Sequence, residues 1–341
     1  MSDAMSDAMS NGMPSGTEND LPMSEVPAIA AARRFDVQRH RRFFIDETPV
    51  GWIRLDDIER LARWPAVFSM RGDAVLLSPL LDSVEKRTDA LGQVIRVLAD
   101  EGRITGWRDE TFAIRNAFDD PPMAFIERAA SRLFGTMTYA VHVNGLIDKA
   151  IALSTLTPTP TPVSASVPTF TAGDDCDLAS ESAAVNLNRL WIARRSHSKA
   201  VDPGMLDTLV GGGIGWGWSI EQTLIKECAE ESGITETLAR QSVPGRTIHV
   251  LAEIEEGTQA EQLFVYDLVL PVDFRPTAMD GEVAEHLDVN VDQALLAIAS
   301  GRMTVDASLA SLDCALRRGW LSSADLPGFI RLYTPPMPGI R

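Results

Sequence analysis

Three glutamates, Glu227, Glu230 and Glu231, stand close together shortly after a glycine run at 211–213. Residues three and four apart project from one face of a helix, so the three carboxylates would converge on a common volume. Carboxylates so close repel one another, but a hard divalent cation such as Mg²⁺ or Mn²⁺ prefers oxygen ligands and would turn repulsion into coordination. Such cations also bind phosphates. The stretch therefore predicts a metal site that acts on a diphosphate.

The glutamates need a helix to position them, and the sequence supplies its ends. Ser219 is a suitable N-cap, and Gly233 stands where a glycine commonly ends a helix. The apolar residues fall on the flank beside the acidic face and predict packing against a sheet; they are Ile220, Leu224, Ile225 and Cys228. The alternative interpretation is an acidic, solvent-facing helix with charge pairs. The glycine run and the terminal glycine favour the metal site.

This stretch resembles the signature of the Nudix hydrolases, Gx5Ex7REUxEExGU, in which U is an aliphatic residue. The terminal EExG aligns with Glu230, Glu231 and Gly233, which places the first glycine of the signature at Gly212 and the glutamate of the RE pair at Glu227. The resemblance implies metal-assisted hydrolysis of a diphosphate bond with Mg²⁺ or Mn²⁺. The metal ligands that it implies are Gly212, Glu227, Glu230 and Glu231.

Two positions depart from the signature. Trp218 stands where the family has a glutamate, and Lys226 stands where it has an arginine. Those two family residues commonly pair, so their loss removes a salt bridge and leaves the metal-facing glutamates in place. The effect of the two replacements is left open, and a non-catalytic binding module that keeps the Nudix scaffold is one alternative.

The flanking segments resemble a two-domain branch of this family, the Nudix proteins associated with thiamine pyrophosphokinase. The shared segments include GWIRL from Gly51, TGWRDE at 105–110, FIERAASRLFG at 125–135 and DGEV at 280–283. The branch implies a small-molecule substrate, thiamine diphosphate or its oxidised or damaged analogues, cleaved to the monophosphate and phosphate. An alternative substrate class is the nucleoside diphosphate derivatives. The resemblance also suggests that the N-terminal domain covers the pocket or helps to select the substrate.

Charged residues outside the signature are further candidates. Glu282 in DGEV could bind metal or act as the base that activates water, and Asp280 is the weaker candidate beside it. Alternatively, Glu282 is a loop carboxylate paired with a neighbouring cation. Arg194, Arg195 and Lys199 could hold the substrate phosphates, and their alternative is a solvated turn.

Three tryptophans are candidates for binding a heteroaromatic ring. Trp107, with its neighbour Arg108, lies in TGWRDE, and Trp216 and Trp218 lie in the loop before the acidic helix. Indole rings stack on aromatic rings and on cations. The alternative for any one of them is packing in the core.

Composition excludes several classes of protein. Thirty-one basic and 48 acidic residues give a formal charge of −17, the opposite of a nucleic-acid-binding surface. No apolar run reaches the length of a membrane span. The three cysteines lack zinc-like spacing, and the N-terminus does not resemble a secretory signal, so we expect a cytoplasmic location. A homodimer is left open.

The expected fold class is α/β: a Nudix α/β/α sandwich with a mixed sheet, preceded by a small α+β N-terminal domain. We expect a disordered tail at 1–35, the N-terminal domain at 36–135, and the Nudix domain at 136–330 with a Thr/Pro/Ser-rich insertion at about 154–188. Periodicity predicts strands at 137–147, 190–194, 247–253 and 263–270. It predicts helices at 87–98, 125–134, 292–300 and 308–318.

Overall fold

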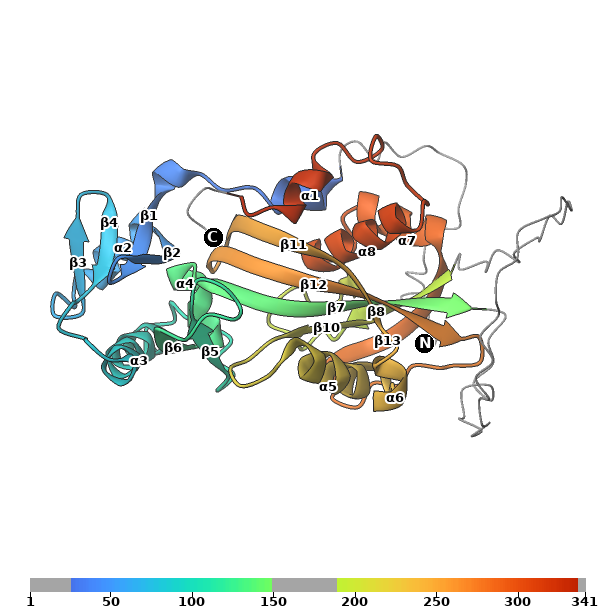
Figure 1. Ribbon diagram of the computed structural model, residues 1–341, viewed down its shortest axis with the longest axis horizontal. Helices are drawn as coiled ribbons and strands as arrows, with labels where there is room; N and C mark the ends of the chain where they lie inside the picture. Colours follow the sequence, from blue (N-terminus) through green and yellow to red (C-terminus); the bar gives the residue numbers. More distant parts are fainter. Residues whose placement is uncertain (1–25, 149–188, 337–341) are drawn as a thin grey trace, which may run out of the picture.

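The computed structural model describes residues 26–148 and 189–336 and shows a small N-terminal domain beside a larger C-terminal one (Figure 1). The expected tail up to residue 25 and the expected insertion at 154–188 lie outside the described residues. Within the described ranges, no helix has the length and apolar character needed to cross a membrane.

The N-terminal domain is an α+β unit built on a four-stranded sheet in the order β2-β1-β4-β3. Its strands are β1 (His40–Ile45), β2 (Thr48–Arg54), β3 (Phe68–Arg71) and β4 (Ala74–Leu77), with a separate hairpin of β5 (Thr111–Ile114) and β6 (Ala124–Glu127). Its helices are η2 (Val37–Arg39), α2 (Leu55–Leu61), α3 (Val84–Asp100), η3 (Arg128–Ala130) and α4 (Ser131–Phe134). The apolar face predicted at 87–98 is confirmed: Leu91, Val94, Ile95 and Leu98 of α3 are buried.

Two local predictions are wrong. The helix predicted at 125–134 is wrong at its start, because Phe125 and Ile126 of β6 pair with Ala113 and Phe112 of β5; the helices η3 and α4 then cover 128–134. Part of the expected tail is ordered. Helix α1 (Pro27–Ala31) packs in the C-terminal core, and the backbone beyond it, at Ala32, accepts a hydrogen bond from the Leu251 amide.

The C-terminal domain is a seven-stranded sheet with the order β11-β12-β7-β8-β13, in which β10 also pairs with β7 and β9 with β8. The parallel pair β12 and β7 lies among antiparallel pairs, so the sheet is mixed, as expected. The strands are β7 (Met137–Asp148), β8 (Arg189–Arg195), β9 (Leu206–Asp207), β10 (Val210–Gly213), β11 (Val243–Ile254), β12 (Gly257–Pro271) and β13 (Val283–Asn290).

Helices cover both faces of this sheet and confirm the α/β/α sandwich (Figure 1). Helices α5 (Ile220–Ser232) and α6 (Glu236–Ala239) lie on one face, and α7 (Val291–Ala299) and α8 (Val305–Arg317) lie on the other; η5 (Phe329–Tyr333) follows. Alternation along β7 builds the two cores: Ala140 and Leu146 belong to the core that contains α8, and Val141 and Val143 belong to the core that contains α5.

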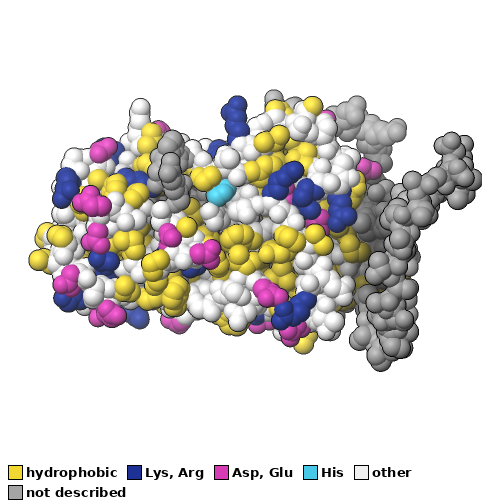
Figure 2. Space-filling view, in the orientation of Figure 1, with side chains coloured by type: hydrophobic (Ala, Val, Ile, Leu, Met, Phe, Trp, Pro, Cys, Tyr) yellow, Lys and Arg dark blue, Asp and Glu magenta, His cyan; other side chains and the backbone are white. Residues whose placement is uncertain are grey.

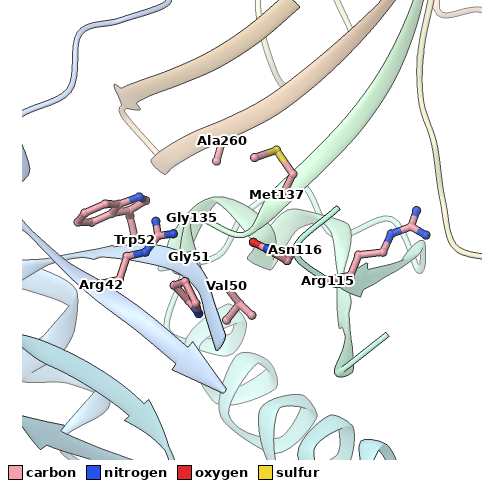
Figure 3. Close-up of a pocket in the computed structure, with 10 residues that line it drawn as sticks. Arg42, Val50, Gly51, Trp52, Arg115, Asn116, Gly135, Met137 and Ala260 are labelled. Carbon is pink, nitrogen blue, oxygen red and sulfur yellow. The ribbon is translucent and has the colours of Figure 1, made fainter. Parts of the chain in front are cut away.

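The two domains meet where backbone approaches backbone. A Cβ atom on Gly257 of β12 would lie 2.0 Å from the carbonyl oxygen of Arg132 in α4. Within the N-terminal domain, one on Gly51 of β2 would lie 2.3 Å from the carbonyl oxygen of Phe134. Figure 3 shows residues of both domains around a hollow at this junction, with Met137 on the side of the larger sheet. The close approach of α4 to β12 holds the N-terminal domain against the larger sheet.

We expect Gly51→Ala to destabilise the protein by about 1–3 kcal/mol or more, since the added methyl group would meet backbone and not a flexible side chain. Gly92→Ala is the matched control. Nothing lies within 4 Å of its added Cβ in the middle of α3, so we expect that change to stabilise the protein by roughly 0.5–1 kcal/mol. Urea denaturation measures both, and equal effects of the two substitutions would contradict the close packing of β2 against the end of α4.

Candidate functional site

Helix α5 holds the acidic residues, and its ends are those that the sequence predicts. The Ser219 hydroxyl accepts a hydrogen bond from the Gln222 amide, and the Gln222 side chain accepts one from the Ser219 amide, which forms a capping box. Gly233 ends the helix with φ +65°. Leu224 and Cys228 are buried, and the glutamates lie on the flank beside them, as the sequence predicts.

Glu231 ties the end of this helix to the glycine-rich strand β10. Its Oε2 accepts a hydrogen bond of 2.8 Å from the Gly211 amide, and only 6% of the residue is exposed. Burial raises the pKa of the Glu231 carboxyl well above its ordinary value. A buried carboxyl whose charge is disfavoured in this way gains strongly from a bound cation.

Glu227 lies against Gly212 of the same strand. A Cβ atom on Gly212 would lie 2.4 Å from both Cγ and Cδ of Glu227, so a glycine is required for the carboxylate to reach this position. Burial also raises the pKa of Glu227. The glycine of the signature therefore acts here by making room for a helix carboxylate.

Lys226 occupies the space between the two other helix carboxylates. Its Nζ donates to Glu230 Oε2 at 2.6 Å and to Glu227 Oε1 at 3.1 Å. Lysine, which stands here where the Nudix signature has arginine, thus still places a cation against the acidic face. Glu230 is partly exposed and paired with Lys226, so the structure does not bring all three helix carboxylates together as one ligand set.

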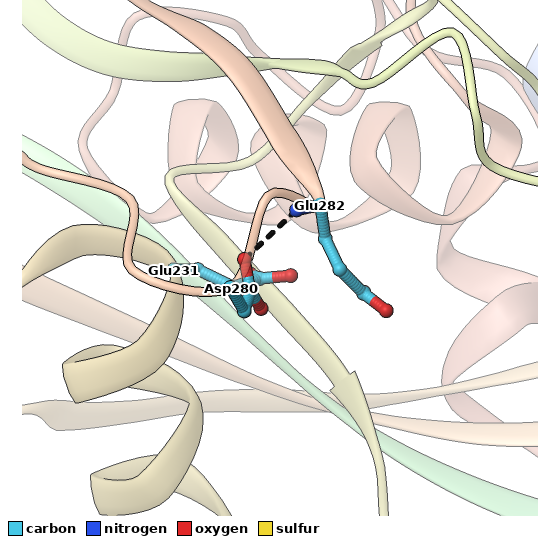
Figure 4. Close-up of side chains that lie close together, drawn as sticks. All are labelled: Glu231, Asp280 and Glu282. Atoms are coloured by element: carbon cyan, nitrogen blue, oxygen red, sulfur yellow. Dashed lines mark hydrogen bonds between the residues drawn. The ribbon is translucent and has the colours of Figure 1, made fainter.

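The carboxylates that converge among the described residues are Glu231, Asp280 and Glu282 (Figure 4). One oxygen of each lies within 4.8 Å of the others. Glu231 comes from α5, and the other two come from the turn before β13. Oxygen donors at this spacing fit a hard divalent cation such as Mg²⁺ or Mn²⁺.

Backbone contacts hold this turn against the end of the helix. The Thr277 amide donates to the Ser232 carbonyl, and the Met279 amide donates to the Glu230 carbonyl. Asp280 Oδ1 then accepts a hydrogen bond of 2.9 Å from the Glu282 amide across Gly281, whose φ is +78°. The place of Asp280 beside Glu231 was underestimated from sequence, although the DG pair is a turn signal.

Two cations contact Glu282. The Nζ of Lys199 donates to its Oε2, and Nη1 of Arg108, from the N-terminal domain, donates to its Oε1 at 3.3 Å. Burial alone raises the pKa of Glu282, but the hydrogen bond from Lys199 and the charges of Lys199, Arg108 and Arg128 outweigh it, so its pKa lies below the ordinary value. The pairing predicted as an alternative for Glu282 is therefore present, and Glu282 also stands beside Glu231 and Asp280.

Arg194 and Arg195 are engaged in ion pairs on the sheet. Nε of Arg194 donates to Glu285 of β13, and Nη1 of Arg195 donates to Asp207 of β9 at 2.9 Å. These contacts differ from a solvated turn. Their proposed role in binding phosphate stays a prediction, whereas Lys199 is placed directly at Glu282.

The three tryptophans lie in two environments. Trp107 packs against the N-terminal core, and its indole nitrogen donates to Asp109 at 2.8 Å. Trp216 and Trp218 are 42% and 48% exposed in the loop before α5. The Trp216 ring lies 5.0 Å from that of Phe125. The loop therefore offers aromatic surface close to the N-terminal domain.

Arg128 was missed as a site residue from sequence, although its segment FIERAA was noted. Its Nη1 donates to Glu110 at 2.8 Å, and a Cβ atom on Gly213 would lie 3.3 Å from its guanidinium carbon. A second arginine of the N-terminal domain thus reaches strand β10. Only the packing of the two domains reveals this proximity.

We expect Gly212→Ala to lower turnover roughly 10- to 100-fold with little loss of stability, because the methyl group displaces the Glu227 carboxylate. Gly215→Ala in the same loop is the matched control, since the nearest atom to its added Cβ lies 3.7 Å away. Steady-state kinetics of both variants, with thermal unfolding, tests this. Equal activities would show that the Glu227 position does not matter.

Comparisons with known proteins agree with this geometry. A family model described as a NUDIX domain matches residues 182–306, and one described as a domain of unknown function (DUF4743) matches residues 25–138. Nudix hydrolase 24, chloroplastic, of Arabidopsis thaliana is 32% identical over 294 residues, which is 85% of this chain and 71% of that protein.

A second plant protein and a solved structure are also similar to this chain. Nudix hydrolase 20, chloroplastic, of the same plant is 32% identical over 301 residues, again 85% of this chain and 71% of that protein. The crystal structure of DR0079 from Deinococcus radiodurans covers 60% of this chain and 98% of its own, with 19% identity and a TM-score of 0.39.

Proposed function

The chain belongs to the Nudix hydrolases, and from that premise we propose that it cleaves thiamine diphosphate, or oxidised or damaged analogues of it, to the monophosphate and phosphate. Its class, a Nudix-type pyrophosphohydrolase, follows from the family, which also favours an enzyme over a non-catalytic binding module. The observation that carries the proposed site is the convergence of Glu231, Asp280 and Glu282 beside Lys199 and Arg108.

Enzymes of this family use divalent metal ions, and the proposed ligands here are Glu231, Asp280 and Glu282, with Glu227 and Glu230 on the adjoining helix face. A bound Mg²⁺ or Mn²⁺ acidifies the attacking water and offsets charge on the phosphoryl oxygens. The predicted backbone contribution of Gly212 remains part of the proposal.

The side chains of the site have different roles in the proposed reaction. Glu282 is kept ionised by Lys199 and Arg108 and is suited to act as an oxygen ligand. Glu227, held beside Gly212 on the adjoining helix face, is the candidate to accept the proton of the attacking water. The cations beside Glu282 oppose the negative charge that develops on the substrate.

The substrate class is supported by aromatic surface in the loop that leads into α5, the helix that carries Glu227 and Glu231. A thiamine derivative combines an anionic diphosphate with a heteroaromatic ring system, and unmodified thiamine carries a ring cation. Trp216 and Trp218 expose indole faces in the loop that leads into α5, where stacking and cation–π contacts are available. Arg194, Arg195 and Trp107 are retained as candidates for a larger binding surface.

A substrate panel tests the proposal. We expect kcat/KM, measured by phosphate release with Mg²⁺, to be higher for thiamine diphosphate and its oxidised analogues than for ADP-ribose or nucleoside triphosphates. A preference for nucleotides would replace the thiamine substrate with the nucleoside diphosphate derivatives and leave the Nudix chemistry intact. A Trp216→Ala variant should raise KM for the preferred thiamine compound more than it lowers kcat.

A cytoplasmic location and the absence of nucleic-acid and membrane partners stay predictions, and a homodimer stays open. On the face drawn in Figure 2, basic side chains lie in several small groups with acidic ones between them, which supports the prediction that nucleic acid is not a partner.

A further inference from the structure

We infer that Arg108 and Arg128 of the N-terminal domain bind the phosphate groups of the substrate, so that both domains build the active site. This inference rests on the proposed function, since it names residues that hold the same diphosphate. Neither arginine lies in the segment matched by the NUDIX family model, residues 182–306.

Arg108 reaches the carboxylate group from across the domain boundary. Its Nη1 donates to Glu282 Oε1 at 3.3 Å, and its side chain is 34% exposed. A guanidinium has five N–H donors, so this single contact leaves donors available for phosphate oxygens. Arginine matches phosphate geometry better than lysine does, because two parallel N–H groups can bind two oxygens.

The segment around Arg108 is held in place by a buried carboxylate. Glu127 is 8% exposed and accepts a hydrogen bond of 3.0 Å from the Arg108 amide. Asp109 adopts φ +60° and binds the Trp107 indole, so the turn on either side of Arg108 is fixed by side-chain contacts. A guanidinium on such a support is oriented before a ligand arrives, which reduces the entropy lost on binding.

Arg128, also from the N-terminal domain, lies against β10. Its guanidinium packs beside Gly213, 5.7 Å from the Phe112 ring, and its Nη1 pairs with Glu110. A side chain at position 213 would crowd it at 3.3 Å. The glycine run therefore makes room for an arginine of the N-terminal domain as well as for a glutamate of α5.

Contacts between the domains keep both arginines in these positions. The Trp216 amide donates to the Thr111 carbonyl at 2.8 Å, which joins the loop before α5 to the segment that follows Arg108. Arg132 of α4 donates to the buried Glu261 of β12 at 3.3 Å. The N-terminal domain is thus attached on both sides of the arginines.

The two arginines offset negative charge at the site. The chain has a formal charge of −17, and its site gathers carboxylates that repel a diphosphate. Lys199 is the cation at Glu282 that the C-terminal domain contributes, and the N-terminal domain contributes Arg108 to the same carboxylate and Arg128 nearby. A local positive region inside an acidic protein is what an anionic substrate requires.

The test measures binding of methylenediphosphonate, a diphosphate mimic that resists hydrolysis, to the full chain in the presence of Mg²⁺ by calorimetry. We expect Arg108→Ala and Arg128→Ala each to weaken its Kd about 10- to 100-fold, the loss of one or two charge-assisted hydrogen bonds. Arg63→Ala is the matched control, because Arg63 is an N-terminal-domain arginine, 45% exposed, that pairs with Glu101. We expect it to bind as the wild type does.

A second readout separates phosphate binding from an effect through Glu282. Removing Arg108 takes a competing cation from that carboxylate, so Mn²⁺ binding without the diphosphonate should be unchanged or tighter. Equal losses of Mn²⁺ and diphosphonate affinity would overturn the inference. Arg108→Lys should recover part of the affinity. If Arg128→Ala fails to fold after losing its contacts with Phe112 and Glu110, Arg128→Gln and the exposed Arg108 still decide the matter.

The failures of the two proposals are distinguishable. If the wild type binds the diphosphonate through both arginines but prefers nucleotides in the substrate panel, the thiamine proposal fails and the inference holds. If the wild type prefers the thiamine series but both arginine variants bind the diphosphonate as the wild type does, the inference fails alone. Absence of diphosphonate binding by the wild type would also overturn the inference.

Discussion

Replacing Glu231 with glutamine should lower turnover with Mg²⁺ at least about 100-fold while the protein stays folded. Glutamine keeps the shape of the side chain and an oxygen that accepts from the Gly211 amide, but it removes the negative charge. Glu231 is the member shared by the helix motif and by the group with Asp280 and Glu282. Steady-state phosphate release measures the loss, and thermal unfolding verifies the fold.

Glu221→Gln is the matched control for this variant. Glu221 lies on the same helix, is 65% exposed at its side chain, and pairs with Arg240 away from the carboxylate group. We expect its activity to stay within about twofold of the wild type, because an exposed ion pair contributes little. Normal turnover by a folded Glu231→Gln variant would show that the metal site is wrongly placed.

Replacing Arg317 with methionine should destabilise the protein by about 3–5 kcal/mol, because two buried carboxylates lose the cation that they share. Arg317 donates to both oxygens of Asp267, at 2.7 and 2.8 Å, and to Asp313 at 2.7 Å. Asp267 is 1% exposed and Asp313 is fully buried. Urea denaturation measures the change. Arg240→Met, which removes an exposed ion pair, is the control and should leave the unfolding midpoint nearly unchanged.

Acidification should narrow the difference in the free energy of unfolding between Arg317→Met and the wild type. Burial alone raises the pKa of Asp267, but the hydrogen bond from Arg317 and the charges of Arg317 and Arg318 outweigh it, so its folded-state pKa is lowered. A lowered carboxyl pKa gives stability that is present above the ordinary value, about 4, and is lost as pH falls through the folded-state value. A difference that stays constant from pH 7 down to acid unfolding would contradict this account.

Local patterns were sufficient to predict the helix of the site. Its caps at Ser219 and Gly233 and its face of glutamates depend on residues within a few turns of one another, and the structure has the helix at Ile220–Ser232. The strand at 137–147 was predictable for the same reason, since its alternating residues face two different cores.

Local patterns could not predict the contacts between segments that are distant in the sequence. Asp280 reaches Glu231 only because backbone hydrogen bonds hold the turn before β13 against the end of α5. Arg128 reaches Gly213 only because the two domains pack together. Likewise, the pairing of β6 with β5 outweighed the helical pattern at 125–127, and the periodicity of a single segment does not reveal such pairing.

The most direct test of the central claim is the rate of phosphate release from thiamine diphosphate by the wild-type chain, with Mg²⁺, with EDTA, and after Mg²⁺ is restored. We predict turnover with Mg²⁺, loss of turnover with EDTA, and full recovery once the metal is returned. Release that continues unchanged in EDTA would contradict metal-assisted hydrolysis at the carboxylates around Glu231.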